Sequence, residues 1–379
     1  MRKLFIILLF GVSVGLANGA PAETVIKVTL LGTGVPVLNA AALKASGRAL
    51  SGLLVEAGPE RMLFDCGQGV YTRLVESGGS KERPNIGVDK VFISHLHSDH
   101  IADLGALYSL GALYRYPISG APAANVPLRI WGPATFKPST NPTPPLPDPP
   151  LDYPPVGIKP MLENFHKAYE TDFYVRQLFT DPKDFSITDA AVETVGSTTD
   201  LPDAPSTVVY SNNGVTVTAF LVNHDPVTPA YGFRVDYQGH SFVYSGDTTY
   251  NDNLVNNSKN VDLLVHEVYG YQRDDAPEIY DYHTSPEDAA RVFLQTNPKL
   301  AVFTHLAIPQ GTTPRDLVRR TRKAGYHGKL KPGRDLMVIK INSNSKVIAK
   351  YLPESEGIDE KPATSDFVEV EQYRRRKTP

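Results

Sequence analysis

The chain has 379 residues, 41% of them hydrophobic, which is enough to bury a substantial core as one large domain or two modest ones. Its formal net charge is −3, so nothing in the overall charge indicates a nucleic-acid partner. The single cysteine, Cys66, excludes an intramolecular disulfide and any cysteine-rich zinc site.

The N-terminus has the layout of a secretory signal peptide. Arg2 and Lys3 precede a largely apolar run over residues 4–16, and small residues follow as far as Ala22. A run of this length is too short to span a bilayer, and no cysteine near the cleavage region offers a lipoprotein anchor. The alternative is an uncleaved membrane anchor. We expect residues 1–22 to be removed, which leaves a periplasmic or secreted protein with no stable membrane anchor.

The first elements of the mature chain are predicted to be strands. An apolar, β-branched run over residues 24–31 predicts one strand, and residues 51–55 and 61–64 predict a hairpin. The hairpin ends in Asp65. Its carboxylate can orient a metal-binding histidine, or it can cap a helix predicted over residues 69–76.

Four potential metal ligands lie within six residues, directly after a short apolar run that predicts a buried strand: His95, His97, Asp99 and His100. Three imidazoles and a carboxylate suit zinc, which takes nitrogen and oxygen ligands. If His95 and His97 bind one ion, Asp99 and His100 can face a second ion about 3.5–4 Å away, as in two-metal hydrolases. A histidine-rich surface loop is the alternative. Three of the chain's ten histidines beside one apolar strand argue against it.

The middle of the chain predicts an insertion over residues 136–206. A helix is predicted over residues 104–114 and a strand over 126–131, and then residues 136–160 contain ten prolines. A helical stretch over residues 161–179 follows, with loops expected to about residue 206. Five Lys/Arg against eleven Asp/Glu give residues 136–210 a net charge of −6. Loops this long in a compact domain are usually functional lids or arms.

A repeated pattern marks the second half of the chain, where apolar strands are followed at once by a histidine or an aspartate. The residues in question are His224, Asp247, His266 and His305. Reactive residues at strand ends gather on one edge of a sheet, where loops can enclose a ligand. Each histidine alone is an ordinary residue, and it is their joint occurrence that indicates a site. A further helix is predicted to begin just after His283, with Thr284 or Ser285 as its N-cap.

Taken together, these motifs resemble the metallo-β-lactamase superfamily. The resemblance is closest to its ribonuclease Z-like branch, which includes ribonuclease Z and an arylsulfatase and phosphodiesterase group. It covers about residues 25–345 without the insertion. The segments that carry it are Leu31-Gly32-Thr33-Gly34, Phe64-Asp65-Cys66-Gly67, His95-x-His97-x-Asp99-His100, Ser245-Gly246-Asp247-Thr248, His266-Glu267 and Thr304-His305. His224 also carries it, between the first and second histidine-containing segments in chain order.

The resemblance implies an α/β fold, a four-layer αββα sandwich with two metal ions at one edge. It assigns His95, His97 and His224 to the first zinc ion and Asp99, His100 and His305 to the second, with Asp247 as the bridge. Mn²⁺ or iron would also suit these ligands. Two such ions would lower the pKa of a bridging water enough to leave hydroxide at neutral pH.

Three residues are predicted to act in catalysis. Asp99 can orient the hydroxide, and His283 occupies the position of the family's catalytic histidine, where it can stabilise the transition state or protonate the leaving oxygen. Glu267 is predicted to orient either His283 or His266. The family often continues this motif as His-Glu-Ala-Thr, whereas this chain has Val268-Tyr269. A surface histidine that caps a helix is the alternative for His283.

The sequence therefore predicts an exported dinuclear zinc hydrolase that cleaves phosphodiester or aryl sulfate ester bonds of small substrates. The catalytic domain is expected over residues 23–352, followed by a charged tail over 353–379. A lactonase or β-lactamase, a tRNA 3′ endonuclease and a non-enzymatic zinc-binding protein are the alternatives. Binding of tRNA requires a basic surface, and both export and the acidic insertion argue against it. The oligomeric state stays open, because the insertion can cover its own cleft or a second subunit of a homodimer.

Overall fold

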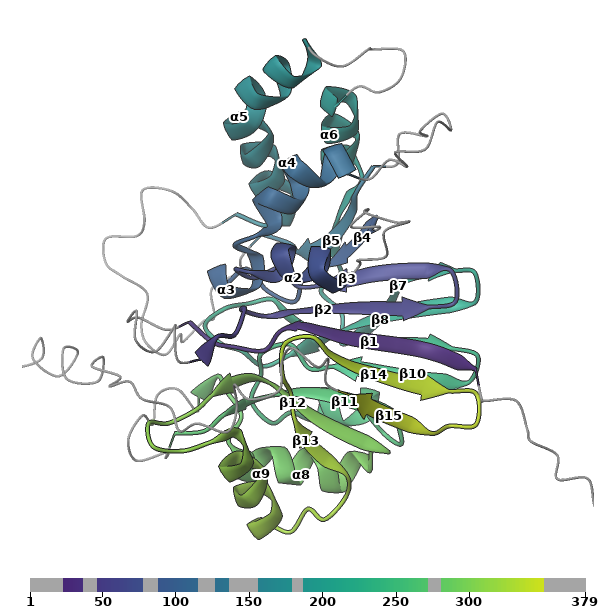
Figure 1. Cartoon of the computed structure of the whole chain (residues 1–379), viewed down its shortest axis with the longest axis vertical. Helices are drawn as coiled ribbons and strands as arrows, with labels where there is room; N and C mark the ends of the chain where they lie inside the picture. Colours follow the sequence, from purple (N-terminus) through teal and green to yellow (C-terminus); the bar gives the residue numbers. More distant parts are fainter. Residues whose placement is uncertain are drawn as a thin grey trace, which may run out of the picture.

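Two mixed β-sheets lie face to face, and helices cover their outer sides (Figure 1). The computed structural model describes residues 23–36, 46–77, 88–114, 127–135, 156–178, 187–271 and 281–350. The predicted signal peptide, most of the proline-rich segment and the predicted C-terminal tail lie outside these ranges. The arrangement confirms the expected α/β sandwich of four layers.

The larger sheet has eight strands in the order β15-β14-β1-β2-β3-β4-β5-β6. Pairing is antiparallel from β15 to β3 and parallel from β3 to β6. The strands are β1 (Thr24–Gly32), β2 (Gly52–Ala57), β3 (Glu60–Phe64), β4 (Lys90–Phe92), β5 (Arg129–Pro133), β6 (Thr198–Leu201), β14 (Met337–Asn342) and β15 (Val347–Lys350). The hairpin of β2 and β3 confirms the prediction for residues 51–64.

The smaller sheet has seven strands in the order β13-β12-β11-β10-β9-β8-β7, parallel from β13 to β10 and antiparallel from there to β7. Its strands are β7 (Ser206–Asn212), β8 (Val215–Val222), β9 (Ala230–Tyr237), β10 (His240–Tyr244), β11 (Leu263–Tyr269), β12 (Leu300–Ala307) and β13 (Leu330–Pro332). Parallel strands bring their carboxyl ends to one edge of a sheet, and this edge carries the predicted ligands.

Three apolar layers hold the sandwich together. Between the sheets, Phe92 stacks on Phe64 at a ring distance of 5.0 Å and on Trp131 at 4.7 Å. A second layer joins the larger sheet to one group of helices, and a third joins the smaller sheet to another group. The helices are α2 (Val70–Ser77), α3 (Ser98–Ile101), α4 (Leu104–Tyr114), α5 (Ile158–Gln177) and α6 (Ile187–Gly196) on the first side, and α7 (Asp252–Asn257), α8 (Pro286–Thr296) and α9 (Pro314–Lys323) on the second.

The insertion contains more regular structure than its sequence predicts. Helix α5 confirms the helical stretch expected near residues 161–179, but the loops expected up to residue 206 are wrong, because α6 and β6 occupy that segment. Helix α6 is stabilised by packing on α4 and α5, where Ala191 lies against Tyr108 and Phe173. Strand β6 adds to the sheet edge beside β5. Figure 1 shows α4, α5 and α6 projecting together from one end of the sandwich.

Two strands also run further than predicted. Strand β11 continues through His266 and Glu267 to Tyr269, and β12 continues through His305 to Ala307. Pairing between these strands carries both of them onward, because Val268 lies opposite Leu306. His266 and His305 therefore lie inside strands, which corrects the expectation that they follow strand ends.

Candidate metal centre

Three imidazoles converge at the first predicted metal position. His95 Nε2 lies 3.0 Å from His97 Nδ1, and His224 Nε2 lies 3.2 Å from the same nitrogen. Ligand atoms about 2.0–2.1 Å from one zinc ion in a tetrahedron lie roughly 3.3 Å apart, so these three nitrogens have the spacing of a ligand set. His95 and His224 are buried and His97 is partly buried.

A second group lies beside the first and contains Asp99, His100, Asp247 and His305, all buried. His305 Nε2 lies 3.1 Å from Asp99 Oδ2 and 3.2 Å from Asp247 Oδ2. His100 Nε2 lies 3.5 Å from Asp99 Oδ2 and 3.3 Å from Asp247 Oδ2. The structure thus brings all seven predicted ligands into two adjacent clusters.

Asp247 lies between the two clusters. Its Oδ2 faces the second cluster and also lies 3.9 Å from His95 Nε2 of the first. Its Oδ1 is buried and has no hydrogen-bond partner among the described residues. A buried carboxylate oxygen without a partner is costly unless a cation or water satisfies it. These donors therefore fit a pair of bound metal ions, with Asp247 placed to contact both.

Local structure explains how one short segment serves both clusters. Strand β4 delivers the chain to His95 and His97, and α3 then begins directly after His97. One helical turn points Asp99 and His100 to the second cluster. His305 reaches the same point from β12 through a β-bulge, where its φ of 46° interrupts the pairing with β11. Bulges of this kind re-aim a side chain beside a site.

The two clusters differ in their proton affinity. Burial lowers the pKa of His95, His97 and His224, to about 3 for His224, so these imidazoles are neutral and able to bind metal at neutral pH. Burial also opposes the charged form of His100 and His305. There the nearby carboxylates, Asp247 above all, outweigh burial, and the pKa of each histidine is raised. A metal ion at the second cluster must therefore displace protons.

Asp65 orients the ring of His100 through the nitrogen that faces away from the metal position. Its Oδ2 lies 2.7 Å from His100 Nδ1 and accepts hydrogen bonds from the hydroxyls of Ser94 at 2.8 Å and Tyr244 at 2.7 Å. Because a carboxylate accepts from Nδ1, Nε2 of His100 is left to face the metal position. This confirms the orienting role expected for Asp65. The alternative helix cap is wrong, since Asp103 Oδ2 accepts from the Gly69 and Tyr71 amides instead.

Glu267 holds His283 rather than His266. Its Oε1 lies 2.8 Å from His283 Nδ1 and accepts from the Thr248 amide at 2.8 Å. Burial and the Asp247 carboxylate raise the pKa of Glu267 to about 8, and burial lowers the pKa of His283 to about 4.

His283 is buried beside the metal ligands, with its ring stacked on that of His305 at a centroid distance of 5.3 Å, so the alternative of a surface histidine is wrong. His266 lies apart, against Phe293, with its Nδ1 bonded to the Glu267 carbonyl.

Several supporting residues carry too little sequence signal to be predicted. The carbonyl of Tyr282 accepts from His224 Nδ1 at 2.8 Å, which fixes the orientation of that ring. Tyr269 stacks on His283 with an interplanar angle of 14°. Tyr244 directly precedes the Ser245-Gly246-Asp247 motif, and this adjacency is the only hint of its bond to Asp65.

Comparisons with known proteins agree with this geometry. The sequence profile of the Beta-lactamase superfamily domain matches residues 172–306, and that of the anti-Pycsar protein Apyc1 matches residues 26–116. The chain is 30% identical over 286 residues to a ribonuclease Z of Mycolicibacterium gilvum, a match that covers 74% of this chain and 84% of that protein. The chain belongs to the metallo-β-lactamase superfamily, in its ribonuclease Z-like branch.

Other relatives extend the match to nearly their full length. A ribonuclease Z of Mycobacterium bovis is 28% identical over 323 residues, which is 84% of this chain and 99% of that protein. YhfI, a metallo-beta-lactamase fold protein of Bacillus subtilis, shares the fold with a TM-score of 0.52 and 22% identity, over 83% of this chain and 98% of its own. The short form of human tRNase Z matches equally well, with a TM-score of 0.52, 21% identity and the same two coverages.

This ribonuclease Z-like protein is a metal-dependent hydrolase, as its relatives and its His/Asp clusters indicate. Within the described residues, no helix is both long enough and apolar enough to cross a membrane.

Proposed function

We propose that this chain is an exported dinuclear zinc hydrolase that cleaves phosphodiester or aryl sulfate ester bonds of small substrates. The observation that carries the proposal is the convergence of seven metal-binding side chains beside a buried His283 held by Glu267. Imidazole and carboxylate donors at this spacing suit zinc, although Mn²⁺ or iron would accept the same ligands.

In such a reaction, different residues of the chain would bind the metal ions and orient the attacking oxygen. His95, His97 and His224 would hold one ion, and Asp99, His100 and His305 the other, with Asp247 between them. When bound, two such ions acidify water and polarise an ester oxygen. Asp99 lies in the second cluster, where its carboxylate can orient the attacking oxygen.

His283 is placed to act as the hydrogen-bond donor to the leaving oxygen. Its Nδ1 is committed to Glu267, so Nε2 is the ring nitrogen available to the leaving oxygen of the ester. A neutral imidazole that carries its proton on Nε2 can donate a hydrogen bond to that oxygen as negative charge develops there.

The charge of the insertion supports small substrates over tRNA. Residues 136–210 carry five Lys/Arg against eleven Asp/Glu, a net of −6. The described part includes α5 and α6, which pack on α4 just beyond the metal-binding loop. Negative charge there would repel an RNA backbone, whereas tRNA binding requires cations that neutralise phosphates. A tRNA 3′ endonuclease is the second candidate, because the relatives that match over almost their full length are named ribonuclease Z.

Export is proposed from the N-terminal residues alone. Arg2 and Lys3, the apolar run over residues 4–16 and the small residues up to Ala22 form the three regions of a signal peptide. N-terminal sequencing of protein recovered from the periplasm or medium would be expected to begin near residue 20 or 23. Full-length protein that begins at Met1 in the cytoplasm would contradict export.

A substrate panel tests the activity. Zinc-loaded mature protein is assayed with bis(4-nitrophenyl) phosphate, a cyclic mononucleotide, 4-nitrophenyl sulfate, a phosphonate ester, a lactone, a β-lactam and a precursor tRNA. We expect the small phosphodiesters or the sulfate to be cleaved with the highest kcat/KM. Efficient cleavage of the precursor tRNA would instead establish the endonuclease, and preference for the lactone or β-lactam would establish attack on a carbonyl. Absence of all activity at full metal loading would favour a non-enzymatic zinc-binding protein.

A further inference from the structure

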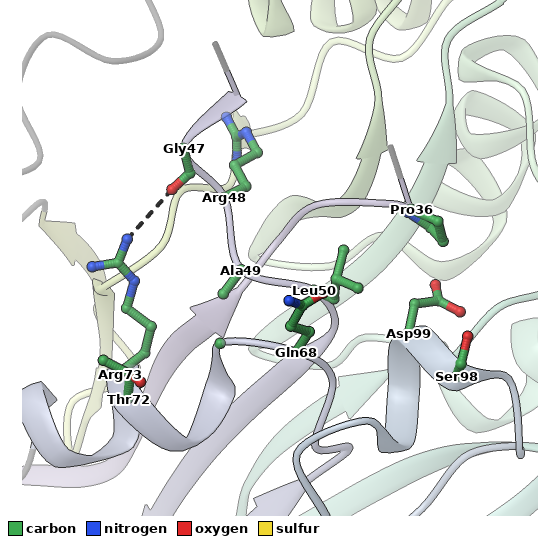
Figure 2. A pocket seen from close by; sticks show the side chains of 11 residues that line it. Pro36, Gly47, Arg48, Ala49, Leu50, Gln68, Thr72, Arg73, Ser98 and Asp99 are labelled. Atoms are coloured by element: carbon green, nitrogen blue, oxygen red, sulfur yellow. Dashed lines mark hydrogen bonds between the residues drawn. The ribbon is translucent and has the colours of Figure 1, made fainter. Parts of the chain in front are cut away.

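A cleft with a volume of about 570 Å³ opens beside the second metal cluster, between the loop before β2 and helix α2 (Figure 2). Asp99 lies at one end of the cleft, and Arg73 lies at the other, past the Leu50 and Gln68 side chains. An ester bound at the metal centre would therefore have room to extend from Asp99 towards Arg73.

The charged residues that line this cleft are Arg48, Arg73 and Asp99. Asp99 is engaged with His305 and His100 at the metal centre. The remaining charges of the lining are both cationic. Gln68, Thr72 and Ser98 add polar groups along the way. The lining thus favours an anion at the end away from the metal centre.

The two arginines differ in how they are held. Arg48 is 8% exposed, and its Nη1 donates to the Thr33 hydroxyl and to the Gly333 carbonyl, so it is a fixed part of the wall. Arg73 is more accessible, with its side chain 28% exposed. Its Nη1 pairs with Glu76, which is 44% exposed, and its Nη2 donates to the Gly47 carbonyl at 3.3 Å (Figure 2). An exposed ion pair of this kind contributes little free energy. An anionic group that binds the Arg73 guanidinium more tightly can therefore replace Glu76.

Asp335 offsets part of the positive charge at this end of the cleft, because its carboxylate interacts with both Arg48 and Arg73. It lies behind the wall, with Oδ2 3.6 Å from Arg73 Nε. Its oxygens already accept hydrogen bonds from the Thr33 amide, the Thr33 hydroxyl and the Ala49 amide. Asp335 therefore fixes the loop that carries Arg48, and it contacts Arg73 through Nε. Among the described residues, the Nη atoms of Arg73 thus have only the exposed Glu76 pair and the Gly47 carbonyl to exchange for a bound anion.

We propose that this cleft is a substrate subsite for a second anionic group, received by Arg73, while the scissile ester lies at the metal centre. The inference rests on the proposed function, because it places the ester beside Asp99. A guanidinium binds carboxylate and phosphate alike through paired N–H donors, so the shared chemistry is an oxyanion. The preferred substrate would then be an ester that carries a further carboxylate or phosphate.

Binding of uncleavable ligands tests the subsite without turnover. Zinc-loaded mature protein is titrated by calorimetry with alkylphosphonates of increasing chain length that end in a carboxylate, a second phosphonate or a neutral amide. At the best chain length, we expect the wild type to bind an anionic end about tenfold more tightly than the amide, the size of effect expected for a charge-assisted pair. A preference between the two anionic ends shows whether a carboxylate or a phosphate is the natural group.

Variants assign the effect to Arg73. Arg73→Gln should reduce the anion-to-amide ratio to less than about twofold, and Arg73→Lys should keep part of it. Arg291→Gln is the matched control, since Arg291 forms an equivalent i,i+3 pair with Asp288 on the surface of α8. The ratio should be unchanged in that variant.

Two results would overturn the subsite: equal affinity for the charged and neutral ligands at every chain length, or an undiminished ratio in Arg73→Gln. Failure of the proposed function looks different. In that case no small ester is hydrolysed in the substrate panel, while the calorimetric preference and its dependence on Arg73 persist.

Discussion

His305 Nε2 lies 3.1 Å from Asp99 Oδ2, although 206 residues separate them in the chain. Asp99 lies in α3, which follows β4 of the larger sheet, and His305 lies in the bulge of β12 in the smaller sheet. Their contact closes the second ligand cluster across the edge of the sandwich. The metal centre therefore depends on the packing of the two sheets as well as on each motif.

Asp247→Ala should abolish hydrolysis. This carboxylate is the one group of the site placed to contact both metal positions, and its Oδ1 has no other partner among the described residues. We expect kcat/KM to fall at least about a thousandfold, by loss of metal-ion catalysis, with bound zinc reduced from two equivalents towards one. Activity with bis(4-nitrophenyl) phosphate and elemental analysis measure the two effects. Asp236→Ala, which removes a surface aspartate paired with Arg234, is the control. Activity equal to that of the wild type in Asp247→Ala would refute the bridge.

Acidification should release the two ions in separate steps. The raised pKa of His100 and His305 means that protons compete for these nitrogens at a higher pH than at His95 and His224, whose pKa values are lowered. As pH falls, the ion at the second cluster should therefore leave first. Zinc per chain after equilibration at stepwise lower pH measures the steps.

Single-site variants assign those steps. The one ion retained by His305→Ala should stay bound to a lower pH than the one ion retained by His224→Ala. Simultaneous release of both ions from the wild type, or the reverse order in the variants, would contradict the assignment of proton affinities.

Local sequence was sufficient to locate the first half of the site. His95, His97, Asp99 and His100 are close in the chain, so a strand followed by one helical turn is enough to place them, and any fold that keeps this loop keeps their spacing. His224 and Asp247 follow β8 and β10 as expected. The order of strands along one sheet edge then brings them to the loop.

Features that depend on partners could not be read from the sequence. The extension of β12 past His305 is decided by pairing with β11, and the helix α6 is decided by packing on Tyr108 and Phe173. Glu267 had two candidate partners in the sequence, His266 on the same strand and His283 sixteen positions on. Alternation along β11 turns the side chains of His266 and Glu267 to opposite faces, so only His283 can meet the carboxylate.

Asp65→Asn should weaken metal binding at the second cluster. One carboxylate oxygen of Asp65 serves His100 Nδ1 and the hydroxyls of Ser94 and Tyr244, and an amide nitrogen in its place would face three donors. Loss of such an orienting partner typically costs about 10–100-fold in metal affinity. Competition with a zinc chelator measures the affinity of each equivalent. The ion at the first cluster should be little affected, and equal weakening of both ions would point to a general loss of structure instead.

Glu267→Ala should lower kcat and leave bound zinc unchanged. Without Glu267 Oε1, His283 loses the hydrogen bond that fixes its ring. Among the described residues, however, the side-chain hydrogen bonds of Glu267 involve only His283 and the Thr248 amide, neither of which is a predicted metal ligand. We expect kcat to fall about 10–100-fold, the lower part of the range for general acid–base groups, with KM nearly constant. Glu267→Gln keeps a hydrogen-bonding group beside Nδ1, because its amide N–H can donate to that unprotonated nitrogen, and should recover part of the rate. Glu287→Ala, which removes an exposed glutamate paired with Arg320, is the control.

A double-mutant cycle shows whether Glu267 acts through His283. If the carboxylate only positions the imidazole, His283→Ala should cost at least as much as Glu267→Ala, and the double variant should be no slower than His283→Ala alone. The positioning role also predicts that the loss in kcat grows as the leaving group becomes more basic, because such leaving groups depend most on a hydrogen-bond donor. Additive losses in the cycle, with no dependence on the leaving group, would mean that Glu267 acts on the reaction independently of His283.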